Sequence, residues 1–175
     1  MSNQATKTNN DASHLEAKVL LRLNNLPKKE NIKVLDAFGG EGLLWKEVIK
    51  RTGKNIKILS IDKNEYKKIN LKGDNMKFLL SFDLTKFDVI DLDAWGSPSN
   101  QLDVLHKKEY KGIVHCTFIQ SMLGNVNKNI LLTYGYTENM IKKCPTLFSK
   151  NGLEKLLYFI NYKFNVDKIK LHSYR

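Results

Sequence analysis

Acidic residues and glycines recur in this chain at positions where they could bind a nucleoside or hold an amine. The segment 36–42 contains an aspartate, a phenylalanine and three glycines. Glycine has no side chain, so its backbone N–H groups can approach a ligand closely, and it tolerates positive φ. The residues of this segment that we assign to a bound nucleoside are Asp36, Phe38, Gly39, Gly40, Glu41 and Gly42.

Three further aspartates follow apolar runs of the chain. Asp62 ends the run 56–61, Asp74 follows a shorter run, and Asp93 ends the run 87–93. Ligands of an open parallel sheet bind beyond the carboxyl ends of its strands. Acids that recur at this place, together with Asp36, therefore predict one shared site.

The elements that must position these acids alternate along the chain. Apolar runs predict strands, and amphipathic segments between them predict helices. Strands are expected at 32–35, 56–61, 71–74, 87–93, 112–119 and 166–174, and helices at 14–26, 43–52, 64–69, 76–82, 101–108 and 153–164. Strands separated by helices indicate βαβ units and hence an α/β domain with a mainly parallel sheet. The region 120–151 shows no clear pattern.

The segment 36–42 lies between a predicted strand and a predicted helix, which is how many α/β nucleotide sites begin. The helix N-terminus adds a partial positive charge there. The glycine spacing matches neither the dinucleotide fingerprint nor a P-loop. An ordinary strand-to-helix turn is the alternative interpretation.

The pattern Asp36-x-Phe38-x-Gly40-x-Gly42 resembles the first motif of class I S-adenosylmethionine-dependent methyltransferases. The resemblance implies a Rossmann-like fold, a central parallel sheet flanked by helices, and S-adenosylmethionine as the cofactor. It also implies that Asp36 orients the glycine loop or meets the methionine amino group of the cofactor. We expect a methyltransferase domain over 13–175, preceded by a disordered N-terminus over 1–12.

Two more segments match places where this family binds adenosine. Asp62 can accept hydrogen bonds from both ribose hydroxyls, and Lys63 can lay its apolar stem along the adenine face. Gly73-Asp74-Asn75 resembles the family's Gly-Asp-Ala segment, whose acid accepts the adenine amino group. Asn75 stands where the family has a small residue. A dinucleotide would need the same acid at position 62, and turn acids without a ligand are the alternative interpretation.

The segment 91–98 bears most directly on the reaction. Its sequence resembles the Asp-Ile-Asp-Pro-Phe-Gly-Ser-Pro segment of tRNA guanine-amino dimethyltransferases. The resemblance implies that Asp93 holds or deprotonates an exocyclic amine while Trp95 stacks on a flipped base. Ala94 stands in place of proline and removes a fixed φ, and a core tryptophan is the alternative for Trp95. The residues assigned to the substrate are Gly96, Ser97 and Pro98.

The resemblance covers Ile32 to about Leu105 and does not extend to the family's large C-terminal RNA-binding part, so it does not carry tRNA specificity. Class I enzymes finish their sheet with two more strands, whereas only one is predicted here after residue 119. Either the middle region contributes a strand, or the C-terminal strand set is shortened. In the second case a homodimer or a partner subunit would cover the edge of the sheet.

The chain is strongly basic, with 29 Lys and Arg residues against 18 Asp and Glu and a formal net charge of +11. Such an excess favours a polyanionic partner such as RNA or DNA, although an AT-rich coding sequence would also enrich lysine. The two cysteines form no Cys-x-x-Cys pair, so no metal site is expected and a cytoplasmic location fits. No apolar run approaches the roughly 20 residues that span a membrane.

Methyl transfer to a nitrogen of a nucleic-acid base, with RNA favoured over DNA, is therefore the leading hypothesis. A methyltransferase of a protein or a small molecule stays open. So does a methyltransferase-like binding module without catalysis, which Ala94 and the short strand set favour. A nicotinamide-dependent oxidoreductase fits poorly because the glycine spacing differs.

Overall fold

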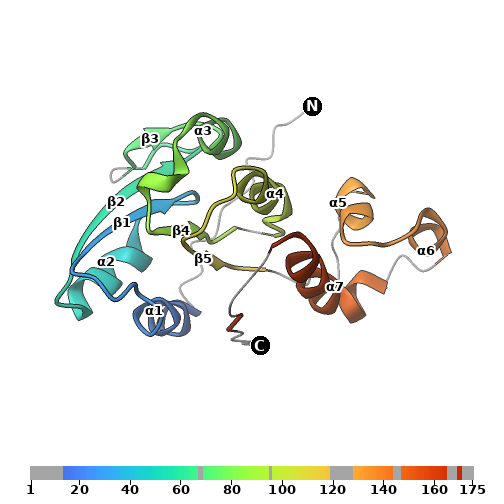
Figure 1. Ribbon diagram of the computed structural model, residues 1–175, viewed down its shortest axis with the longest axis horizontal. Helices are drawn as coiled ribbons and strands as arrows, with labels where there is room; N and C mark the ends of the chain where they lie inside the picture. The colour runs from blue at the N-terminus through green and yellow to red at the C-terminus, as the bar shows by residue number, and fades with distance from the viewer. Residues whose placement is uncertain are drawn as a thin grey trace, which may run out of the picture.

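The computed structural model describes residues 14–66, 69–94, 96–118, 128–143, 147–164 and 169–170 (Figure 1). Strands and helices alternate through the first two thirds of the chain, and helices follow. The elements are α1 (Leu15–Leu23), β1 (Asn31–Asp36), α2 (Leu43–Arg51), β2 (Asn55–Asp62), β3 (Leu71–Lys72), α3 (Asn75–Ser81), the 3₁₀ helix η2 (Leu84–Lys86), β4 (Val89–Leu92), α4 (Ser99–Lys107), β5 (Ile113–Cys116), α5 (Lys128–Thr133), α6 (Glu138–Lys143) and α7 (Leu147–Lys163).

The five strands form one parallel sheet in the order β3-β2-β1-β4-β5. β1 lies at the centre, where Asp36 pairs in register with Ser60 of β2 and with Asp91 of β4. The side chains of β4 are all buried, as expected for a strand covered on both faces. The predicted Rossmann-like α/β fold with a parallel sheet is confirmed.

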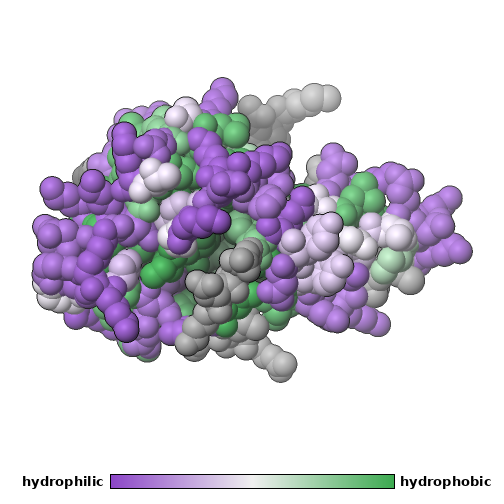
Figure 2. All heavy atoms as spheres, viewed as in Figure 1, coloured by the Kyte–Doolittle hydropathy of each residue, from purple (hydrophilic) through white to green (hydrophobic). Residues whose placement is uncertain are grey.

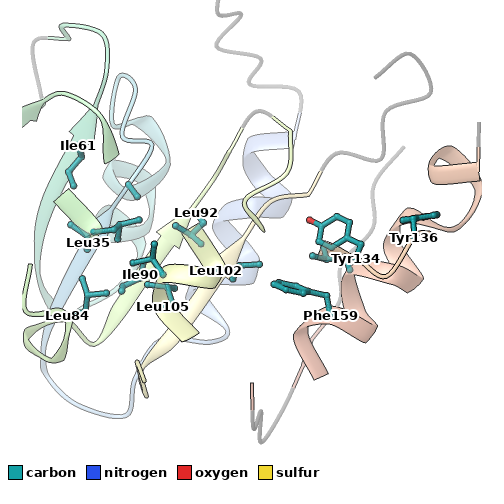
Figure 3. Packing of buried hydrophobic residues seen from close by; sticks show 14 residues of the cluster. Leu35, Ile61, Leu84, Ile90, Leu92, Leu102, Leu105, Tyr134, Tyr136 and Phe159 are labelled. Carbon is teal, nitrogen blue, oxygen red and sulfur yellow. The ribbon is translucent and has the colours of Figure 1, made fainter. Parts of the chain in front are cut away.

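Helices cover both faces of the sheet because successive side chains of a strand point in opposite directions. Val34 and Val89 pack toward α1 and α2, in a cluster with Val19, Trp45 and Val48. On the other face a larger cluster joins the sheet to α3, α4 and the C-terminal helices (Figure 3). Its labelled members are Leu35, Ile61, Leu84, Ile90, Leu92, Leu102, Leu105, Tyr134, Tyr136 and Phe159.

The helices α5, α6 and α7 lie beyond β5, at the end of the molecule away from β2 and β3 (Figure 1). Tyr134 and Phe159 join them to the larger cluster, with ring centroids 5.5 Å apart. The predicted helix 153–164 is confirmed, but α7 begins earlier, at Leu147, and has a non-helical residue at Asn151. The region without a clear sequence pattern contains α5 and α6.

One predicted helix is wrong. Residues 64–66 and 69, the described part of the segment 64–69, lie outside any helix. Asn64 N–H donates to Asp62 Oδ1 at 2.8 Å. Asn70 Oδ1 then accepts from the backbone N–H of Ser60 at 2.8 Å and draws the chain back against β2.

Several predictions fall on residues that the structure does not describe. The N-terminal segment 1–12 is one of them. Of the predicted last strand, 166–174, only 169 and 170 are described, and these two residues are not in a strand. Within the described parts of the chain, no helix has the length and apolar character needed to cross a membrane.

Candidate active site

The turn after β1 adopts a conformation that requires glycine at two positions. Gly40 and Gly42 have φ angles of 48° and 70°, in the left-handed region that side chains disfavour. Gly42 is also the N-cap of α2, and its N–H donates to the carbonyl of Gly39 at 2.8 Å. The predicted glycine turn therefore connects the end of β1 directly to the start of α2.

Gly39 has a packing role. A Cβ atom at this position would lie 2.9 Å from Ser60 Cβ and 3.0 Å from Ile69 Cδ1. The N–H of Gly39 donates to the carbonyl of Ile61 at 2.9 Å. Close approach to β2 explains a glycine here without a ligand.

Asp62 joins the end of β2 to the glycine turn. Its Oδ2 accepts the N–H of Gly40 at 3.0 Å, and its Oδ1 accepts the N–H of Asn64 at 2.8 Å. Each carboxylate oxygen retains capacity for a second hydrogen bond, so these contacts leave room for a ligand hydroxyl. Lys63 follows with an exposed side chain.

The segment after β3 supports the same edge of the sheet. Asp74 is the N-cap of α3, and its Oδ1 accepts the N–H of Met76 at 2.9 Å. Asn75 Nδ2 donates to the carbonyl of Ala37 at 2.9 Å and its Oδ1 accepts from Gln101 at 3.1 Å. Asn75 thus ties the end of β1 to α3 and α4, which the sequence did not predict.

Three aspartates lie together at the carboxyl ends of β1 and β4. Asp36 and Asp91 are buried, and Asp93 follows two residues later with a side chain that is 20% exposed. Burial raises the pKa of Asp36 well above its usual value, and the charges of Asp91 and Asp93 raise it further. The N–H of Phe38 donates to Asp36 at 3.3 Å and opposes this shift.

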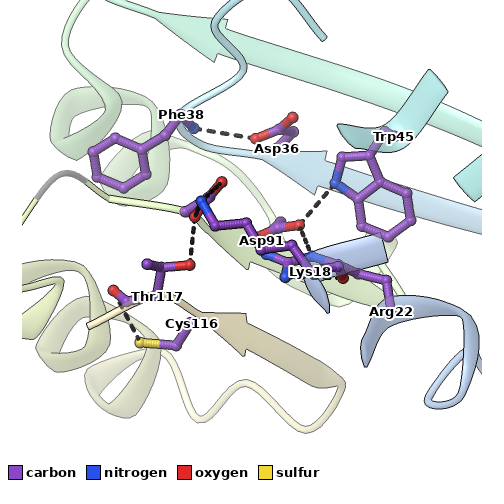
Figure 4. A network of polar contacts seen from close by, with 9 residues as sticks. Lys18, Arg22, Asp36, Phe38, Trp45, Asp91, Cys116 and Thr117 are labelled. Carbon is purple, nitrogen blue, oxygen red and sulfur yellow. Dashed lines mark hydrogen bonds and ion pairs between the residues drawn. The ribbon is translucent and has the colours of Figure 1, made fainter. Parts of the chain in front are cut away.

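Asp91 accepts hydrogen bonds from two side chains, one on α1 and one on α2 (Figure 4). Arg22 Nε donates to Asp91 Oδ2 at 2.9 Å and Arg22 Nη2 donates to Oδ1 at 2.7 Å. Trp45 Nε1 also donates to Oδ2, at 2.8 Å. Sequence reasoning missed both partners. The available signal was an arginine placed among the apolar residues of the first helix.

Asp93 is held from two elements. Lys18 Nζ on α1 lies 2.8 Å from each of its carboxylate oxygens, and Thr117 Oγ1 donates to Oδ1. Thr117 follows β5 directly, so α1 and β5 both position the predicted catalytic acid (Figure 4). The sequence did not predict that Lys18 and Thr117 would contact Asp93.

The loop after β4 carries the residues assigned to the substrate. Gly96 has a φ of 120°. The hydroxyl of Ser97 forms a hydrogen bond with the hydroxyl of Tyr134, in the turn that follows α5. Pro98 is buried and precedes α4. Trp95 lies outside the described residues. Ala94 is only 5% exposed, so the first part of the loop after β4 is buried.

The remaining predicted residues differ in exposure. Phe38 is half-buried and packs against the larger core cluster, and Glu41 is exposed. Asp36 ends β1, Asp62 ends β2 and Asp93 follows β4, and these three strands are adjacent in the sheet. The glycine turn contacts Asp62 through the N–H of Gly40. The sheet therefore brings the predicted carboxylates to one edge, as parallel strands require.

Comparison with known proteins gives one partial relative. The chain is 34% identical over 100 residues to the tRNA (guanine(26)-N(2))-dimethyltransferase of Methanobrevibacter smithii. The match covers 48% of this chain and 26% of the relative, so only about a quarter of the relative's length is represented here. No family model matches the chain, and no solved structure matches it significantly. The name of the relative agrees with the family that the segment 91–98 resembles.

Proposed function

We propose that this protein is an S-adenosylmethionine-dependent methyltransferase that acts on a nitrogen of a nucleic-acid base, with RNA preferred to DNA. The observation that carries the proposal is the meeting of Asp36, Asp62 and Asp93 at the carboxyl edge of β1, β2 and β4, beside the glycine turn. The partial relative is named as an enzyme of this kind.

The charges around Asp36 fit a cationic ligand. Three carboxylates, those of Asp36, Asp91 and Asp93, lie near two cations, Arg22 and Lys18. Burial and like charges raise the pKa of Asp36, and the charge of Arg22 offsets only part of this rise. The amino group of S-adenosylmethionine would supply a further positive charge beside Asp36. The free oxygen lone pairs of Asp62 would accept ribose hydroxyls, as an acid after the second strand does in related sites.

S-adenosylmethionine supplies an activated methyl group when it is bound, so the chain has mainly to orient the acceptor. Asp93 holds the target amine and accepts its proton. Lys18 and Thr117 fix the orientation of this carboxylate. Trp95 stacks on the base and keeps its nitrogen in line with the methyl group.

Nucleic acid is the preferred substrate for two reasons. The net charge of +11 favours association with a polyanion. The partial relative is named for tRNA, and we extend to this chain only the RNA class.

A binding module without catalysis is the second candidate. One observation favours it: Thr117 donates to Asp93 Oδ1 and Lys18 Nζ lies 2.8 Å from both carboxylate oxygens, so only Oδ2 keeps capacity for a substrate amine. An assay of methyl transfer separates the two functions, since both allow the cofactor to bind.

Titration calorimetry of the folded protein with S-adenosylmethionine tests the cofactor. We expect saturable binding, and a loss of about tenfold or more in the Asp62→Ala variant because charged hydrogen bonds are removed. Glu65→Ala, at an exposed position on the same loop, is the matched control and should bind normally. No binding by the folded wild-type protein at millimolar ligand would reject the cofactor assignment.

Transfer of a labelled methyl group to total tRNA, DNA and protein tests the acceptor. Label in RNA is the expected result. Label confined to protein or to small molecules would reject a nucleic-acid acceptor. Cofactor binding without any transfer would favour the binding module.

A further inference from the structure

Two tyrosines form the most exposed apolar feature in the described part of the chain. Tyr158 and Tyr162 of α7 are 64% and 76% exposed, more than any other large hydrophobic side chain described. Their spacing of four residues places them on one side of the helix. The ring planes are within 8° of parallel and the centroids are 6.3 Å apart. The pair is therefore an exposed aromatic cluster whose rings lie nearly parallel.

The same helix packs against Tyr134, which contacts a loop of the candidate active site. Leu156 and Phe159 are buried, and the ring of Phe159 meets that of Tyr134 edge to face (Figure 3). The hydroxyl of Tyr134 hydrogen-bonds Ser97, in the loop that follows β4 and precedes α4. Packing thus connects the exposed tyrosines to the loop assigned to the substrate base.

The segment of the chain that carries the pair contains more lysines than acidic residues. Residues 128–164 include six lysines and two glutamates. Lys142, Lys143 and Lys150 are exposed, and Lys155 Nζ lies 5.5 Å from the ring centroid of Tyr136. Figure 2 shows hydrophilic side chains around the rim of the end formed by α5, α6 and α7, with intermediate and hydrophobic ones between them. A purely apolar partner would meet a basic surface here.

We propose that Tyr158 and Tyr162 are a stacking platform for unpaired nucleotides of an RNA substrate, outside the site of methyl transfer. Stacking on an aromatic ring suits any base, and nearby lysines can neutralise the phosphates. The inference rests on the proposed function for its choice of RNA. It adds a contact surface that holds the nucleotides flanking the target base.

Fluorescence anisotropy with a short labelled oligouridylate, measured without cofactor, tests the platform. We expect Tyr162→Ala and the double variant with Tyr158→Ala to bind about 5- to 100-fold more weakly than the wild type. Tyr162→Phe keeps the ring and should bind within about twofold of the wild type. Leu80→Ala removes another exposed side chain, on α3, and should have no effect.

The slope of affinity against salt should stay unchanged in the tyrosine variants, because tyrosine neutralises no phosphate. Wild-type affinity in the folded double variant would overturn the platform. Sedimentation equilibrium covers a further outcome: if the double variant only dissociates a dimer, the tyrosines are a contact between copies and the proposal is wrong. Calorimetry with S-adenosylmethionine on the wild type keeps the tests separate, since failure there rejects the proposed function and not the platform.

Discussion

Arg22 and Asp91, separated by 69 residues in the chain, form a buried ion pair with two hydrogen bonds. The arginine is on α1 and the aspartate is on β4, two residues before Asp93. Their side chains are 2% and 0% exposed. The pair fixes the first helix against the strand that carries the predicted catalytic acid, and Lys18 on the same helix reaches Asp93.

Removing one partner of this pair should destabilise the fold strongly. In Arg22→Met the carboxylate of Asp91 stays buried without its guanidinium, and we expect a loss of about 3–5 kcal/mol in the free energy of unfolding. Urea denaturation followed by circular dichroism measures it. The exposed pair of Lys72 and Glu65 provides the control, since Lys72→Met should change stability by less than about 1 kcal/mol.

The double variant Arg22→Met/Asp91→Leu should be more stable than either single variant, because neither charge is then buried alone. Trp45 Nε1 would lose its acceptor, so full recovery is not expected. Equal losses in the double variant and in Arg22→Met would contradict an important role for the charge of Asp91.

The next prediction concerns Asp93 and its lysine. Asp93→Asn should reduce methyl transfer by about 10²–10⁴-fold if the carboxylate accepts the proton of the amine. Lys18→Met should reduce it by about tenfold through loss of a charged hydrogen bond, and Lys18→Arg should restore part of the rate. Steady-state assays should place the Lys18 effect in kcat, with cofactor affinity unchanged.

Asp103→Asn serves as the matched control for the activity measurements. This acid lies on α4 and pairs with exposed Lys107 at 2.7 Å. We expect full activity. Undiminished activity in Asp93→Asn would show that the reacting amine is held elsewhere.

His115 should make stability depend on pH. Burial lowers its pKa to about 4, and the described residues offer its Nε2 no hydrogen-bond partner. The unfolded chain, with a histidine pKa near ~6.5, therefore binds more protons between these values. Stability should fall as the pH drops from ~7 to ~5, with a contribution from this residue on the order of 2 kcal/mol.

Asp36 acts in the opposite direction, because its raised pKa makes the folded state bind more protons in acid. The difference between the wild type and His115→Leu isolates the histidine. Urea midpoints at several pH values give that difference, which should grow toward low pH. Parallel curves for the two proteins would show that His115 titrates normally in the fold.

Gly39 and Gly53 should respond differently to a methyl group. Gly39→Ala forces a contact of 2.9 Å with Ser60 Cβ, and we expect a loss of about 1–3 kcal/mol. Gly53 has nothing within 4 Å of the added Cβ and no positive φ, so Gly53→Ala should be neutral or slightly stabilising. Thermal denaturation compares the two variants. Equal stability would mean that the turn can move away from β2.

The sequence predicted the five strands of the described sheet, four of them from apolar runs, whereas β3 is only Leu71–Lys72 and was placed by the Gly-Asp that follows it. The glycine turn was also predictable, since Gly40 and Gly42 adopt backbone angles that other residues disfavour. The helix expected at 64–69 was wrong. Asn70 Oδ1 accepts from the backbone N–H of Ser60, which holds this segment against β2. A contact between residues ten positions apart leaves no periodic pattern in the sequence.

By itself, the sequence determined a parallel α/β sheet and the place of Asp36, Asp62 and Asp93 at its carboxyl edge, because strand polarity follows from the order of strands and helices. Only the tertiary structure decided which hydrogen-bond donors reach Asp91 and Asp93. Arg22, Lys18 and Thr117 come from segments far away in the chain, and packing of α1 and β5 around β4 brings them there. Hydrophobic periodicity encodes which face of a helix is buried, but not which charge it will meet across the core.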